Sequence, residues 1–196
     1  MQHKCKVTVI DKKLYPELQA QYCADPNSGA CPVYNVGDEY IFERYGKADD
    51  FWHIGLGTLT RDGGGESLAG STQFPHCSEA WDAISRYIYT ALQGGSIMRG
   101  WMNDERVMIA CCSDGTRPVI FKIQRLDYKA LYIDGIGCEK CEQKISAALR
   151  SITGVVDVVF RHEDGFTEVF LDHDVPDDTL KQAVEACGGY TVTKID

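Results

Sequence analysis

"LYIDGIGCEKCEQKISAALRSITGVVDVVF" (residues 131–160) decides the fold of the C-terminal part of this chain. A run typical of a β-strand stops at Asp134-Gly135, and a helical pattern follows it. One face of that helix would carry Cys141, Ile145, Ala148, Leu149 and Ile152. Cys138 and Cys141 stand between the two patterns, in a C-x-x-C spacing. The stretch therefore predicts a strand-to-helix junction that carries a pair of thiols.

The sequence around this junction predicts a small βαββαβ domain over residues 128–196. Strands are expected at 129–135, 154–162, 165–173 and 190–195, and helices at 139–152 and 176–189. The second helix has Pro176 at its start and Gly188 at its end, which are typical helix boundary residues. This order within about seventy residues is the ferredoxin-like arrangement.

Residues 1–127 predict a separate α+β domain. Strands are expected at 5–11 and 39–44, helices at 13–23 and 78–95, and a β-hairpin over 106–127 with its turn at Asp114-Gly115. Residues 46–76 are rich in Gly, Asp and Ser and predict mostly loop. The connection at 125–131 contains no Gly, Pro or Ser, so we expect it to be short and stiff and to hold the two domains in a fixed or narrowly hinged arrangement.

Composition excludes several classes of partner. The 196 residues are 44% hydrophobic and 25% charged, and the net charge of −9 argues against nucleic acid or an anionic membrane as partner. The sequence shows no export signal and no apolar stretch long enough to span a membrane. We therefore expect a cytoplasmic protein that is not inserted in a membrane.

Nine cysteines are many for a cytoplasmic chain of this length. Their odd number and the missing export signal argue against a disulfide framework. Reduced thiols in such a chain pack as small apolar groups, bind metal or perform chemistry.

The Cys138/Cys141 pair suits a soft metal ion. Its thiols would lie at a helix N-terminus, where free N–H groups and the helix dipole stabilise thiolates. Two thiolates favour Cu(I), with Zn(II), Cd(II) and Hg(II) as alternatives. A structural zinc site would need further ligands, and no second C-x-x-C follows in this domain. A redox pair of the thioredoxin type remains an alternative, although the neighbouring residues do not match that motif.

The segment "DGIGCEKCEQKISAALRSITGVVDVVF", followed by "GGYTV", resembles the heavy-metal-associated domain of copper chaperones and metal-transporting ATPases. The resemblance implies metal binding by Cys138 and Cys141. It also implies transfer of the ion to a metal-transporting ATPase or another metal acceptor. The family has Met where this chain has Ile136; that Met packs beneath the loop, so Ile should preserve the packing.

Two residues near the end of the second helix leave alternatives open. Cys187 is a candidate third ligand, but its spacing from Leu180 and Val184 favours a core residue. Tyr190 either caps the metal loop or packs in the core.

The first domain carries six of the cysteines. "CPVYNVGDE" and "DGTRPVIF" are similar to motifs of an uncharacterised bacterial family, CPV-x-x-VGDE and DG-x-RPV-x-F, over most of residues 4–127. A second metal or thiol site could draw on Cys23, Cys31, Cys77, Cys111 and Cys112. Cys111 and Cys112 are adjacent on a predicted strand and should point to opposite faces. Cys5 and one member of that pair are expected to be buried.

Two functional hypotheses follow. In the first, the chain binds a soft metal ion through its C-x-x-C loop and hands it on. In the second, residues 1–127 form a thiol- or metal-dependent enzyme, and the C-terminal domain supplies or senses metal.

Overall fold

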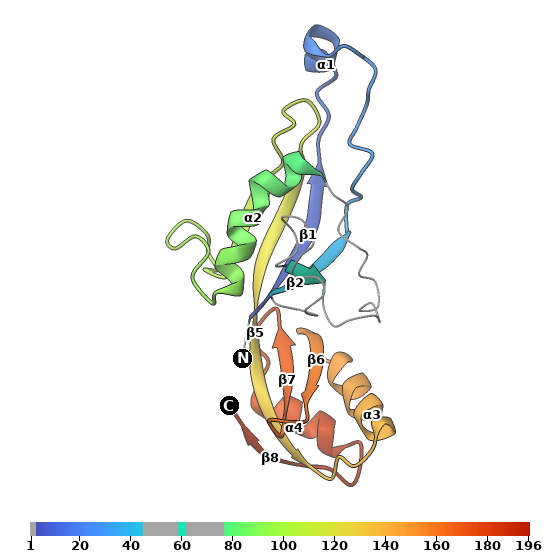
Figure 1. Cartoon of the computed structure of the whole chain (residues 1–196), viewed down its shortest axis with the longest axis vertical. Helices are drawn as coiled ribbons and strands as arrows, with labels where there is room; N and C mark the ends of the chain where they lie inside the picture. The colour runs from blue at the N-terminus through green and yellow to red at the C-terminus, as the bar shows by residue number, and fades with distance from the viewer. Residues whose placement is uncertain (1–2, 45–58, 62–76) are drawn as a thin grey trace. The chain divides into compact units, whose positions relative to one another are not determined.

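The computed structural model describes residues 3–44, 59–61 and 77–196. It divides into two compact units, Met1–Arg125 (unit 1) and Leu126–Asp196 (unit 2). The elements of each unit are shown in Figure 1. The predicted loop at 46–76 lies outside the described residues, apart from the short strand β3 (Leu59–Arg61).

Unit 1 is built on an antiparallel sheet. Its strands are β1 (Lys4–Lys12), β2 (Glu39–Arg44), β3, β4 (Val107–Cys111) and the first half of β5 (Val119–Asp134). They follow the order β3-β2-β1-β5, and β4 pairs with β5. The predicted hairpin is confirmed, because β4 and β5 pair antiparallel from Val107–Gln124 to Cys111–Ile120.

Two helices accompany this sheet. Helix α2 (Ser78–Leu92) packs against β1, β2 and β4 with an apolar face, which consists of Ala80, Ile84, Ile88, Ala91 and Leu92. Helix α1 (Pro16–Tyr22) is shorter than the predicted span of 13–23. It begins at Pro16 because proline fixes a helical φ and lacks the N–H that a first turn leaves unbonded.

β5 corrects one prediction. We expected two strands separated by a short connection at 125–131, but the chain forms one strand of 16 residues, Val119–Asp134. Side chains alternate between buried and half-buried positions from Val119 to Ile123, and no Gly or Pro interrupts the extended backbone up to Asp134. The boundary between units therefore falls within a strand. Division into domains at residue 127/128 remains a prediction.

Unit 2 has the element order that the sequence predicts. After β5 come α3 (Glu139–Arg150), β6 (Val155–Arg161), β7 (Phe166–Leu171), α4 (Asp177–Glu185) and β8 (Thr191–Ile195). The sheet order is β6-β7-β5-β8, with every pair antiparallel. α3 and α4 contact each other, α3 packs on β6 and α4 on β8 (Figure 1). The ferredoxin-like fold of unit 2 is thus confirmed.

The core of unit 2 joins both helices to the sheet. Ile145 and Leu149 of α3, and Leu180 and Val184 of α4, are completely buried. They pack with strand residues such as Val169. Because α3 is anchored in this core, the position of its first turn is defined, and so is that of the C-x-x-C loop that leads into it. No helix in the described part of the chain is long and apolar enough to cross a bilayer.

Candidate metal centre

The C-x-x-C loop lies where β5 ends and α3 begins. Cys138 is the N-cap residue of α3, with extended backbone angles, and its side chain is exposed. The backbone N–H groups of Cys141 and Glu142 donate to the Cys138 carbonyl, at 2.9 and 3.2 Å. These bonds form the first turn of the helix and bring Cys141 over the loop. The predicted placement at a helix N-terminus is therefore observed.

The Cys141 thiol has a lowered pKa, so that a large fraction of it is thiolate near neutral pH. Its pKa is lowered to about 7, chiefly by a hydrogen bond from the Cys138 thiol, then by the Tyr190 hydroxyl and the Gly137 backbone. The same contact raises the pKa of Tyr190 to about 12, because the protonated phenol donates a hydrogen bond to the Cys141 sulfur, which deprotonation would abolish. A thiolate is both the nucleophile and the metal ligand of cysteine, so this arrangement favours metal binding.

Tyr190 therefore fills both roles that the sequence left open. Its ring packs against the buried core of unit 2, and its hydroxyl bonds to Cys141. Two left-handed glycines, Gly188 (φ 80°) and Gly189 (φ 79°), turn the chain from the end of α4 into this position.

Gly135 permits the close approach of the Tyr190 segment to the metal loop. It has a φ of 95°, in the left-handed region that favours glycine. A Cβ atom here would collide with the Gly189 carbonyl oxygen and would touch the Tyr190 ring at 3.5 Å. In the sequence, Gly135 marks only the end of the strand pattern, and its role in this approach was not predicted. The sequence signal that could have indicated this close approach is a glycine placed directly between the strand pattern and the C-x-x-C.

Ile136 packs against the core of unit 2, as the sequence led us to expect. Its half-buried side chain supports the loop from the inner side, while Gly137 and Cys138 are exposed. With Ile in place of Met at position 136, the sulfur atoms that this loop offers to a metal ion all come from cysteine.

Cys187 corrects the expectation of a core residue. α4 ends at Glu185 with its C-cap at Ala186, so the helical spacing from Leu180 and Val184 stops before Cys187. Its thiol is partly exposed and donates to the Ala183 carbonyl at 3.4 Å. The Lys144 ammonium of α3, a contact that we did not predict, donates to the Cys187 carbonyl.

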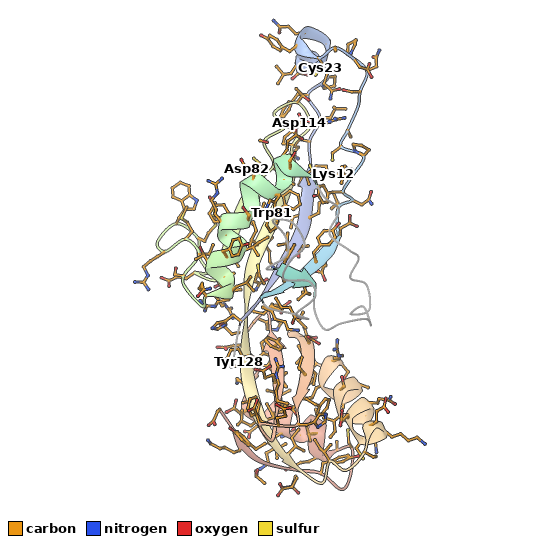
Figure 2. The ribbon with its side chains drawn as sticks, in the orientation of Figure 1. Lys12, Cys23, Trp81, Asp82, Asp114 and Tyr128 are labelled. Carbon is orange, nitrogen blue, oxygen red and sulfur yellow. The ribbon has the colours of Figure 1, made fainter. Side chains whose placement is uncertain are left out.

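The cysteines of unit 1 fall into distinct environments. Cys5 in β1 and Cys112 after β4 are buried, and burial raises the pKa of both thiols. Cys111 is exposed on the opposite face of the strand from Cys112, as predicted. Cys23 is the C-cap residue of α1. Figure 2 shows it beside that helix, far from Trp81 of α2.

Three of these cysteines gather around Tyr34. Cys31 and Cys77 are partly buried and pack against the core cluster that includes both Tyr34 and Cys112. Burial is the main cause that raises the pKa of Tyr34, and the nearby thiols of Cys77, Cys31 and Cys112 add to it. The structure thus groups three of the five candidate residues for a second site and leaves Cys23 and Cys111 apart.

The chemistry open to the C-x-x-C loop is that of two adjacent sulfur ligands. Within residues 3–44, 59–61 and 77–196, no group of three or more His, Cys, Asp or Glu side chains is arranged to hold a metal ion. A tetrahedral zinc site of four ligands is therefore not preformed in this part of the chain. Two thiolates fit a soft ion of low coordination number.

Comparison with known proteins gives one finding for unit 2 and none for unit 1. No curated protein and no solved structure matches the chain. The resemblance of residues 4–127 to an uncharacterised bacterial family gains no support. Residues 130–190 match the family model of the heavy-metal-associated domain, which indicates heavy-metal binding or a chaperone-like role for this part of the chain.

Proposed function

We propose that this protein is a soft-metal carrier that binds Cu(I) between Cys138 and Cys141 and transfers it to another protein. The pairing of an exposed Cys138 with a Cys141 thiol of pKa about 7 carries the proposal. One sulfur is open to an incoming partner, while the other is available as a thiolate at neutral pH.

The identity of the ion follows from the donor set. Thiolates are soft ligands that select Cu(I) over hard cations such as Mg²⁺ and Ca²⁺. Zn(II), Cd(II) and Hg(II) share the affinity for sulfur, but Zn(II) prefers four ligands. Cys187 as a third ligand stays a prediction, because no group of three metal-ligating side chains is preformed in the described part of the chain. Reduced thiols and Cu(I) both require a reducing compartment, which supports a cytoplasmic location.

Transfer would proceed by thiolate exchange. A thiolate of the acceptor binds the ion while it is still held by Cys138 and Cys141, and the bond to the more exposed Cys138 breaks first. A second acceptor thiolate then replaces Cys141. No electron moves, and the ion leaves as Cu(I). An acceptor with two exposed thiols, such as a metal-transporting ATPase, would suit this sequence of steps.

A competition titration tests the binding step. The reduced full chain is titrated with Cu(I), and in parallel with Zn(II), against a chromophoric chelator under anaerobic conditions. We expect Cys138→Ser with Cys141→Ser to lose about one equivalent of Cu(I) relative to the unmodified chain. The matched control is Cys23→Ser with Cys111→Ser, which removes two thiols and should change nothing. An unchanged stoichiometry and affinity in the first variant would refute the proposal.

A further inference from the structure

Strand β4 (Val107–Cys111) lies at one edge of the sheet of unit 1. Among the described residues it pairs only with β5. The side chains of Met108 and Ala110 pack against the core of unit 1, whereas Ile109 (36% exposed) and Cys111 reach solvent. The second edge of β4 therefore has no strand beside it in this part of the chain.

Hydrogen bonds to β5 show which backbone groups of β4 face this open edge. The Cys112 N–H donates to the Val119 carbonyl at 3.1 Å, and the Arg125 N–H donates to the Arg106 carbonyl at 2.9 Å. In an antiparallel ladder such bonds recur at every second residue, so the even-numbered residues of β4 face β5. The N–H and C=O groups of its odd-numbered residues therefore point away from β5.

The chain itself occupies the outward N–H groups at both ends of this edge. The Val107 N–H donates to the Asp104 carbonyl at 3.1 Å, and the Ser113 N–H donates to a carbonyl in the first turn of α2 at 3.3 Å. Between these ends, the backbone groups of Ile109 and Cys111 have no strand partner within the described ranges. Each of these two residues thus presents one N–H and one C=O outward.

The sequence of β4 has none of the features that keep an open edge from pairing. Natural edge strands are protected by charged side chains, especially Lys, by Pro or by β-bulges. β4 reads "VMIAC", which contains no charge and no Pro, and its register with β5 is continuous. Such an edge is a template on which a further β-strand can pair.

We propose that β4 pairs with β4 of a second copy of this chain, antiparallel about a two-fold axis at Ala110. In this register Ile109 of each copy lies opposite Cys111 of the other copy. The outward N–H groups of these residues then bond to the outward C=O groups of the facing strand. The two Ala110 residues form the non-hydrogen-bonded pair at the axis, where their small side chains fit the close approach of the strands.

A second copy fits this edge because the edge is complementary to itself. No residue of β4 is charged, so antiparallel pairing brings no like charges opposite one another within the strand. Beyond the strand, the Arg106–Asp104 ion pair of one copy comes toward the Asp114–Arg117 ion pair of the other, and neither pair carries a net charge. The same patch is used by both copies, which closes the assembly as a dimer.

The size of the contact sets the strength that we expect. One short strand from each copy makes a small interface, and small interfaces belong to weak or transient complexes. We therefore expect a dissociation constant of roughly 10–500 μM. The proposal is independent of metal binding, because β4 belongs to unit 1 and the C-x-x-C loop to unit 2.

Sedimentation equilibrium of the reduced, metal-free full chain tests the proposal, over about 5 μM to about 1 mM. We expect the mass to rise with concentration from that of one chain toward that of two. Ile109→Lys places a charge at the paired edge and should weaken association by at least about tenfold. The matched control is Ile10→Lys, because Ile10 has a similar exposure (40%) but belongs to β1, which lies between β2 and β5.

Ile109→Pro is a second variant with a different physical effect. It removes an N–H that points away from β5, so the bonds between β4 and β5 stay in place while a bond to the second copy is lost. We expect this variant to be monomeric at concentrations where the unmodified chain is dimeric. Circular dichroism and thermal unfolding show whether each variant is folded.

Two further measurements separate this dimer from other kinds of association. Adding Cys138→Ser and Cys141→Ser should leave the dimer unchanged, which excludes a link through the C-x-x-C loops. A short bismaleimide should join Cys111 of one copy to Cys111 of the other, as peptide mass spectrometry would show.

The proposal is overturned if the unmodified chain stays monomeric up to about 1 mM. It is also overturned if Ile109→Lys and Ile10→Lys associate equally, or if the dimer disappears when Cys138 and Cys141 are replaced. None of these outcomes alters the test of metal binding by Cys138 and Cys141.

Discussion

At the scale of single residues, the pKa of Cys141 depends on the groups that donate to its sulfur. The Cys138 thiol contributes most, followed by the Tyr190 hydroxyl and the Gly137 backbone. The folded-state pKa of about 7 lies below the ordinary value of 9.0. Between these two values the unfolded chain binds more protons than the folded one. This group therefore adds stability as the pH rises from 7 to 9, and that contribution is lost below about pH 7.

Tyr190→Phe should raise the pKa of Cys141 part of the way from about 7 to 9.0, because one donor is removed and the Cys138 donor stays. The measurement is the rate of Cys141 alkylation as a function of pH in the metal-free protein. Tyr132→Phe is the matched control, since the Tyr132 ring contacts Phe166 and Lys194 instead. A pH profile that Tyr190→Phe leaves unchanged would show that the phenol does not act on this thiol.

Gly135→Ala should destabilise unit 2. A left-handed backbone costs a residue with a Cβ about 1–2 kcal/mol, and the collision with the Gly189 carbonyl adds to it. Gly137→Ala is the control in the same loop, because its Cβ would meet nothing within 4 Å. We expect the control to stay within about 0.5 kcal/mol in urea unfolding. Equal stability of the two variants would contradict the close approach of the Gly189 segment.

At the scale of elements, α3 holds the loop in place through its buried face. Ile145→Ala should lower the free energy of unfolding by about 2–5 kcal/mol, because the side chain is 0% exposed and its removal leaves a cavity. Gln143→Ala, on the exposed face of the same helix, should change it by less than about 0.5 kcal/mol. Thermal or urea unfolding measures both. Similar losses would mean that α3 does not pack as described.

The elements of unit 2 were predictable because each had a strong local signal. Apolar spacing defined α3, and Pro176 with Gly188 bracketed the second helix, although α4 itself ends at Glu185. The position of Cys138 and Cys141 followed from that order. The continuity of β5 was missed, because a strand that joins two sheets looks the same in sequence as two strands. The only indication in residues 125–131 was the absence of Gly, Pro and Ser, which argues against a flexible linker but does not predict a continuous strand.

Other parts of the candidate sites depend on tertiary contacts that no local pattern reveals. Cys31, Cys77 and Cys112 are far apart in the sequence, and only folding brings them to Tyr34. The contact between Gly135 and the Gly189 segment joins the two ends of unit 2 in the same way. For Cys187, a helical spacing was extended past the end of α4, where it no longer applies.

At the scale of the whole molecule, the connection between the units is part of β5 and has hydrogen-bonded partners on both sides of the boundary. Gln124 pairs with Val107 of β4, and Asp127 pairs with Leu171 of β7. We expect limited proteolysis to spare residues 124–131, since a strand must first be separated from its hydrogen-bonded neighbours before it can enter a protease active site. Rapid cleavage there, releasing two stable halves that no longer associate, would show a loose tether instead.

If Cys138 and Cys141 together hold a soft metal ion, footprinting of the unmodified full chain should show both thiols protected by the ion. The reduced protein is alkylated before and after loading with Cu(I), and the rate is measured at each cysteine by peptide mass spectrometry. We expect Cu(I) to slow alkylation of both Cys138 and Cys141 by at least about tenfold, while the exposed Cys111 reacts as before. Unchanged rates at Cys138 and Cys141 in the loaded protein would contradict it.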